Sequence, residues 1–358
     1  MKKFTFTLLL VWQINLTLQA QTNNFNYDRY WTKVQIKELG GLPKSADSIV
    51  TKIYKQAKAD NNQIQLIKSL IYKSKFMIAL EEEAQLKVVQ LFLREITEIQ
   101  SHNRHLLENM LADIYWQYYQ RNRWKIYNRS RTTTKVDEDD FRTWDLTTIF
   151  NEIHALFQMS LKNHHKTQLI DLNDYNEILI TADGSKRFRP TLFDFLAHNA
   201  LDFYGTSESR INQPSYQFNI TDPKCFTDFD TIELRSSDSL SPKLNTLIIY
   251  KKLGGIHRDF RYPEAWMYNR VSLLDFLHKN AVIPDKDELY VNALLGLTEK
   301  YRKEHATSLA HFKIADFYDK ISTGYSIDSN NDRQFKRRKA LEICNDVLGY
   351  LSNTSLQI

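Results

Sequence analysis

Residues 27–59, YDRYWTKVQIKELGGLPKSADSIVTKIYKQAKA, contain two amphipathic segments joined by a tight turn. Apolar side chains recur every three or four residues in both segments, which is the spacing of an α-helix with one buried face. Gly40-Gly41-Leu42-Pro43 separates them and predicts the end of one helix and the start of the next. Together with Trp31 and Ala46, this layout resembles the helix–turn–helix unit of repeat arrays. The inward positions are Tyr27, Tyr30, Trp31, Val34 and Leu39, then Ile49, Val50, Ile53 and Ala57.

The helical pattern continues along most of the chain. Further helices are predicted at 63–79, 83–99, 106–124, 146–161, 190–204, 239–253, 265–280, 284–303, 306–321 and 335–351. Such segments are longer than typical strands. Nine glycines and seven prolines are too few for a turn-rich β-sandwich. The sequence therefore predicts an all-α fold of antiparallel helix pairs in a tetratricopeptide-like, α-solenoid array with an irregular middle segment.

Composition divides the predicted array into two parts. An N-terminal helical domain is expected at 22–204 and a C-terminal, tetratricopeptide-like region at 239–358. Between them, residues 205–238 are rich in Ser, Asn, Asp and Thr and form the predicted loop-rich connection. Pro190 is expected in the first turn of the apolar, central helix 190–204.

The first 21 residues have the layout of a secretory signal peptide. A basic start, Met1-Lys2-Lys3, precedes the apolar run FTFTLLLVW at 4–12 and a polar stretch around Ala20. This run is too short to span a bilayer. We therefore expect export to the periplasm or cell envelope, with no transmembrane helix in the mature chain. Because no cysteine follows the signal, a lipoprotein anchor is not predicted.

Charge and cysteine content narrow the class of protein further. The formal net charge is +5, and removal of Lys2 and Lys3 with the signal peptide brings it closer to neutral. This balance gives no reason to expect a nucleic-acid partner. Cys225 and Cys344 are the only cysteines, and their spacing leaves a disulfide open. Two buried, unpaired thiols are the favoured interpretation.

Motifs that would indicate catalysis are missing from the sequence. His102 with His105, and His164 with His165, lack a third ligand at metal-binding spacing. There is no GxSxG elbow and no glycine-rich phosphate loop. The acidic run at 137–140 lacks the alternating ligands of a calcium loop. We therefore predict a non-enzymatic protein without metal or cofactor; an unrecognised hydrolase using Asp/Glu pairs is the least favoured alternative.

One stretch, IYWQYYQRNRWKIYNR at 114–129, interleaves aromatic and basic side chains. Such a mixture could form a partner surface by stacking. The favoured alternative is that the aromatics pack between helices while the arginines cover the rim or pair with residues 137–140. Arg187, Phe188 and Arg189 allow the same two interpretations. The candidate partner surface consists of Tyr115, Trp116, Tyr119, Arg121, Arg123 and Trp124.

Five stretches in this order resemble the helical N-terminal region of large bacterial alpha-2-macroglobulin-like proteins. They are GLPKSA at 41–46, LADIYWQYYQRNRWKIYNR at 111–129, FRTWDL at 141–146, RPTLFDFLAHNALDFY at 189–204 and VIPDKDELY at 282–290. That family consists of exported protease traps, many with a Cys-x-Glu-Gln thioester. Cys225 is followed by Phe-Thr-Asp and Cys344 by Asn-Asp-Val, so neither matches the thioester, and the macroglobulin domains are not part of this sequence.

The resemblance implies a scaffold without inhibitory machinery. Our leading hypothesis is a non-enzymatic exported helical scaffold, a truncated or split member of the protease-inhibitor family, with a protease or an envelope protein as its partner. The alternative is a stand-alone, tetratricopeptide-like module of the cell envelope that binds a protein or a glycan.

Overall fold

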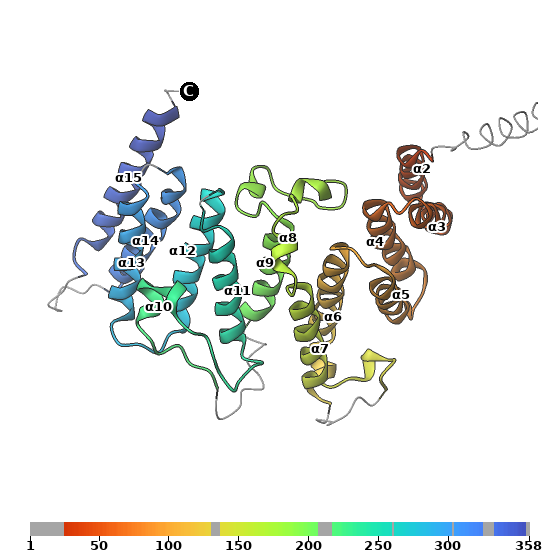
Figure 1. Ribbon diagram of the computed structural model, residues 1–358, viewed down its shortest axis with the longest axis horizontal. Helices are drawn as coiled ribbons and strands as arrows, with labels where there is room; N and C mark the ends of the chain where they lie inside the picture. Colours follow the sequence, from red (N-terminus) through yellow and green to blue (C-terminus); the bar gives the residue numbers. More distant parts are fainter. Residues whose placement is uncertain are drawn as a thin grey trace, which may run out of the picture. The chain divides into compact units, whose positions relative to one another are not determined.

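The computed structural model describes residues 25–129, 137–206, 217–259, 261–302, 304–324 and 333–355, with side chains as far as residue 349. These residues form α-helices and short 3-10 helices, and an isolated bridge between Asp171 and Thr191 is the only β-type pairing among them (Figure 1). The helices pack against their chain neighbours in an all-α helical-repeat array, which confirms the predicted fold class. The predicted signal peptide, 1–21, lies outside the described residues.

Contacts divide the chain into two compact units, residues 1–88 and 89–358. In the first unit, α3 (Pro43–Ala59) packs against both α2 (Tyr27–Leu39) and α4 (Gln63–Leu80). α5 (Ala84–Glu98) begins in this unit. The predicted boundary at 205–238 stays a prediction. The core of the first unit consists of Trp31, Val34, Ala46, Val50, Ile53 and Phe76.

Local sequence explains how α2 and α3 begin and end. The Asn26 side chain accepts a hydrogen bond from the Arg29 backbone N–H at 2.9 Å and caps α2. Gly41 follows α2 at φ 68°, a left-handed conformation that glycine adopts without steric cost. Pro43 then occupies the first turn of α3, where its missing N–H is harmless. This turn matches the prediction from the Gly-Gly-Leu-Pro sequence.

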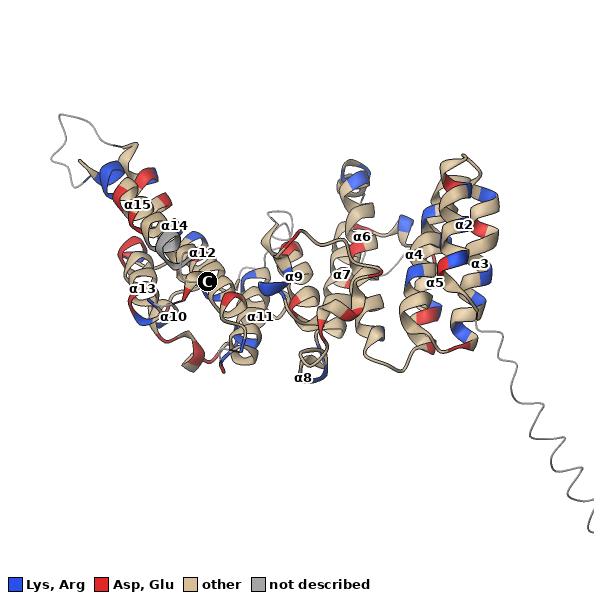
Figure 2. Ribbon diagram, turned by 90° about the horizontal axis from the view of Figure 1, so that it is seen from above, with Lys and Arg blue, Asp and Glu red and all other residues tan. Residues whose placement is uncertain are grey.

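The second unit is a row of longer helices in which successive members are neighbours. α6 packs against α7 and α9, α9 packs against α11, and from α11 to α15 each helix contacts the next. Both signs of charge alternate along these helices (Figure 2). The helices are α6 (Asn103–Tyr127), α7 (Leu146–Ser160), α9 (Leu192–Gly205), α11 (Pro242–Ile256), α12 (Pro263–Asn280), α13 (Lys286–Lys300), α14 (Ser308–Ser322) and α15 (Lys336–Ser355).

The described part of the irregular middle segment is packed and ordered by its own apolar residues. It contains α10 (Lys224–Thr227) and the 3-10 helix η5 (Phe229–Thr231), neither of which the sequence pattern predicted. Ile220, Cys225, Phe226 and Phe229 are buried in the same core as α12, α13 and α14. This segment therefore forms part of the wall of the second unit rather than only a connection.

The start of α9 differs from the prediction. Pro190 precedes the helix, and its carbonyl accepts a hydrogen bond from Leu172 N at 2.9 Å. Thr191 caps the helix instead, in a reciprocal capping box with Asp194. Asp194 Oδ1 also accepts a buried hydrogen bond from His257 Nε2 at 2.7 Å, which links α9 to the end of α11.

The two cysteines occupy different environments. Cys225 is buried and Cys344 is exposed, and both are free thiols. The expectation that both are buried is wrong for Cys344, which occupies an exposed position on α15. None of the described helices is both long and apolar enough to cross a lipid bilayer.

Candidate functional site

The aromatic members of the sequence-predicted partner surface lie mostly inside the second unit. Tyr115 and Tyr119 on α6 are 2% and 0% exposed, and Trp116 is half-buried. Their rings pack against Phe141, Phe150 and Phe203, with centroid distances between 4.9 and 5.3 Å. Burial at this level excludes Tyr115 and Tyr119 from a partner surface, which corrects that part of the prediction.

The two arginines of the same prediction and Trp124 lie outside the core. Arg121, Arg123 and Trp124 are exposed, with Trp124 at 74%, and the Arg123 guanidinium lies 5.5 Å from the Trp124 ring centroid. Arg142 donates two hydrogen bonds to the Asp140 carboxylate and holds its pKa below the usual range. Whether the exposed remainder of α6 binds a partner stays a prediction.

In the second aromatic–basic stretch, at 187–189, Phe188 and Arg189 line a cavity of about 430 Å³. The Arg187 guanidinium lies 5.0 Å from the Phe188 ring, and Arg189 lies 5.9 Å from the ring of Tyr268. Arg189 also donates a hydrogen bond of 3.4 Å to the Tyr268 hydroxyl. Here the basic groups are satisfied by their own aromatic neighbours.

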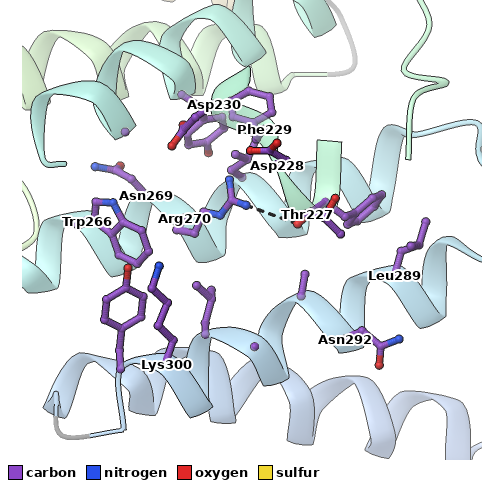
Figure 3. A pocket seen from close by; sticks show the side chains of 18 residues that line it. Thr227, Asp228, Phe229, Asp230, Trp266, Asn269, Arg270, Leu289, Asn292 and Lys300 are labelled. Carbon is purple, nitrogen blue, oxygen red and sulfur yellow. Dashed lines mark hydrogen bonds between the residues drawn. The ribbon is translucent and has the colours of Figure 1, made fainter. Parts of the chain in front are cut away.

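A larger groove, of about 570 Å³, lies in the second unit where α10 and η5 face α11, α12 and α13 (Figure 3). Trp266 and Lys300 are at one end of it, Leu289 and Asn292 at the other, and Arg270 lies between. We call it the α12–α13 groove. Its lining is Phe226, Thr227, Asp228, Phe229, Asp230, Tyr250, Gly254, Trp266, Asn269, Arg270, Leu273, Leu289, Asn292, Ala293, Gly296, Leu297, Lys300 and Tyr301.

The floor of the groove follows from helical spacing on α13. Leu289, Asn292, Gly296 and Lys300 are separated by three or four residues and so share one face. Gly296 is exposed, and a Cβ added there would meet no atom within 4 Å. The helix backbone is therefore open to a ligand at this position.

One end of the groove is aromatic. The Trp266 and Tyr301 ring centroids are 4.8 Å apart at an interplanar angle of 57°. The Lys300 ammonium lies 5.3 Å from the Tyr301 ring, a cation–π arrangement at the rim. These half-buried rings provide apolar area and remain reachable from the groove.

Arg270 is the most unusual group in the groove. Burial lowers the pKa of its guanidinium, and the nearby charges of Asp230 and Asp228 only partly offset this effect. Its Nη2 donates one long hydrogen bond, 3.4 Å, to the Phe226 carbonyl. Among the described residues no carboxylate lies within ion-pair distance of it. A guanidinium has five N–H donors, and the bond to Phe226 is the one hydrogen bond that Arg270 makes among the described residues.

Asn269 forms a buried polar point at the back of the groove. It is 3% exposed, and its side chain lies in hydrogen-bonding contact with that of His198 on α9. The pKa of His198 is lowered to about 4, first by burial and then by the charge of Arg189.

The groove combines aromatic and apolar walls with the guanidinium of Arg270, which makes one long hydrogen bond, and the exposed amide of Asn292. Such a combination is typical of ligand sites. The described residues contain no cluster of three His, Cys, Asp or Glu able to hold a metal. His105, a candidate ligand in the sequence, has one ring nitrogen 2.9 Å from Glu108 and the other 3.0 Å from Asn163.

Sequence reasoning missed the groove. Trp266 and Arg270 are four residues apart on α12, and Gly296 and Lys300 are four apart on α13, so each pair shares one face of its helix. These two faces were the signal in the sequence that could have located the groove. Asp228 and Asp230 fall in the segment that was predicted to be a connection. The sequence matches no protein-family model, no curated protein and no solved structure at a significant level.

Proposed function

We propose that this protein is a non-enzymatic, helical-repeat binding module that docks an extended segment of a protein partner in the α12–α13 groove. The observation that carries the proposal is the groove itself, which has an open backbone floor at Gly296 and a half-buried, incompletely paired arginine above it. Helical arrays commonly present such surfaces to partners.

The dimensions of the groove favour a peptide. From Leu289 to Lys300 the α13 helix rises by about 16 Å, at roughly 1.5 Å per residue. An extended chain advances about 3.3 Å per residue, so the floor accommodates about five residues. The exposed Asn292 amide on this floor can both donate to and accept from a ligand backbone.

The wider setting is a proposal supported by the sequence alone. The signal-like start favours a role outside the cytoplasm, in the periplasm or cell envelope, and the mature protein is expected to begin near residue 22 on N-terminal sequencing. The resemblance to alpha-2-macroglobulin-like proteins favours a scaffold that mounts inhibitor domains. Incubation with a panel of proteases should then give no trapping by this chain alone; covalent or size-selective trapping would contradict the proposal.

The test of docking uses the purified protein and a fluorescent pool of acetylated, amidated pentapeptides of randomised sequence. Gly296→Leu should lower binding at least tenfold, because it places a bulky side chain on the groove floor at a position where an added Cβ meets no protein atom within 4 Å. Leucine also favours helix over glycine by roughly 0.5–1 kcal/mol, so the fold should persist.

Gly255→Leu is the matched control. Gly255 is exposed near the end of α11, outside the groove lining, and an added Cβ there also meets nothing within 4 Å. Equal binding by the wild type and both variants, or no binding by any of them, would refute docking in the groove.

A further inference from the structure

We infer that the segment accepted by the α12–α13 groove has mixed charge, with a side-chain carboxylate on Arg270 and a basic side chain against Asp228 and Asp230. This inference rests on the function proposed above, since it names the chemistry of the docked segment. Two independent features of the groove carry it, the state of Arg270 and the position of the two aspartates, and the exposed amide of Asn292 adds the preference for a peptide.

The environment of Arg270 favours a ligand with an anionic oxygen. It has lost much of its water to burial, which lowers its pKa, and has gained one long hydrogen bond in exchange. The planar guanidinium fork matches a carboxylate through two parallel N–H···O bonds. A ligand carboxylate would supply the partner that the described protein groups do not provide.

Asp228 and Asp230 exclude a purely acidic ligand. Both side chains are exposed, line the groove and make no ion pair with Arg270, although their charges act on it. With Lys300 at the Trp266 end, the groove holds two basic and two acidic groups. A run of acidic residues would be attracted at Arg270 and repelled at the aspartates, whereas a segment with both signs satisfies each.

Asn292 favours a peptide over a free carboxylic acid. Its exposed amide lines the groove and offers an N–H₂ donor and a C=O acceptor. A peptide group presents one acceptor and one donor, which complements this side chain.

The experiment compares two pools of acetylated, amidated pentapeptides, one with glutamate fixed at the centre and the other with glutamine, all other positions being random. Dissociation constants are measured by fluorescence polarisation with the whole purified protein, and retained peptides are sequenced by mass spectrometry. The glutamate pool should bind about tenfold more tightly, and retained peptides should be enriched in Lys or Arg beside the glutamate.

Two sets of variants assign these preferences to residues. Arg270→Met should abolish the preference for the glutamate pool, while Arg258→Met, an exposed arginine outside the groove, should leave it unchanged. Asp228→Asn combined with Asp230→Asn should remove the enrichment in Lys and Arg and leave the glutamate preference in place. A merely structural role of these residues would weaken both pools equally.

The outcomes separate the inference from the proposed function. Equal binding of both pools would overturn the carboxylate inference and leave docking intact, whereas no binding of either pool would overturn both. Enrichment of Asp or Glu beside the central glutamate would overturn the role assigned to Asp228 and Asp230. Displacement of the peptides by free glutamate or inorganic phosphate at equal concentration would identify a small anion as the ligand, contrary to the inference.

Discussion

The α6 seam, which is residues 115–124 of α6 with the rings of Phe141, Phe150 and Phe203 packed against them, and the α12–α13 groove contain the same kinds of residue in opposite arrangements. In the seam Tyr115 and Tyr119 are buried, and Arg121 and Arg123 are exposed. In the groove the rings of Trp266 and Tyr301 are half-buried, and Arg270 is largely withdrawn from water. An aromatic–basic stretch therefore marks either a packing seam or a recognition site, depending on which of the two groups is buried.

The difference is one of free energy. In the seam, buried rings contribute apolar area while the charges keep their water, so each group stabilises the fold or is neutral. In the groove, Arg270 loses water and gains one long hydrogen bond in exchange, which costs stability. Such local costs are typical of functional sites in otherwise consistent sequences.

The largest expected effect is on the seam side of the comparison. Tyr119→Ala removes a fully buried ring that packs against Phe150 at 4.9 Å and should lower the free energy of unfolding by about 3–5 kcal/mol. Trp124→Ala, on the same helix but 74% exposed, should change it by less than about 0.5 kcal/mol. Urea denaturation of the three proteins measures both, and equal losses would contradict the division of α6 into core and surface.

An intermediate effect on the free energy of unfolding is expected at His198, which contacts Asn269 of the groove lining. His198 has an ordinary pKa of 6.5 that burial lowers to about 4 in the folded protein. As the pH falls from 6.5, the unfolded chain therefore takes up a proton that the folded protein binds only near pH 4. Stability is fully present above pH 6.5 and should decrease by roughly 3 kcal/mol by pH 4, at about 1.4 kcal/mol per pKa unit.

His198→Gln isolates this contribution, because the other titrating groups remain in both proteins. The variant should lose less stability than the wild type between pH 6.5 and 4 in urea denaturation at a series of pH values. His154→Gln is the matched seam variant, since burial lowers the pKa of His154 as well. Identical pH profiles for the wild type and His198→Gln would show that His198 is not held neutral.

Arg270→Met is expected to have the smallest effect on stability, although its expected effect on binding is the largest. Arg270→Met retains the length of an apolar stem and removes a poorly paired guanidinium, so the free energy of unfolding should stay within about 1 kcal/mol of the wild type, or rise. Thermal unfolding measures this directly. A loss above about 3 kcal/mol would mean that Arg270 stabilises the fold, as the buried residues of the seam do, and would contradict the distinction between the two regions.

Much of the fold could be predicted from local pattern. The Gly-Gly-Leu-Pro turn gives α2 its observed bounds, Tyr27–Leu39, and the periodic segments locate the long helices to within a few residues. Predictions failed where a local signal competed with a tertiary one. Pro190 is a good first-turn residue, yet the capping box of Thr191 and Asp194 sets the start of α9. The short helix α10 has no periodic pattern, and Phe226 orders it through burial.

The sequence by itself determined the helical class, the succession of long helices and the turn chemistry between them, because helix formation depends on side-chain spacing within a few residues. Only the tertiary structure decided which aromatics are buried and which charges lack partners. Arg270 lies on α12, Asp228 between α10 and η5, and Lys300 on α13, and their meeting depends on how these elements pack. Burial and unfilled hydrogen bonds are properties of that packing, and they distinguish the groove from the seam.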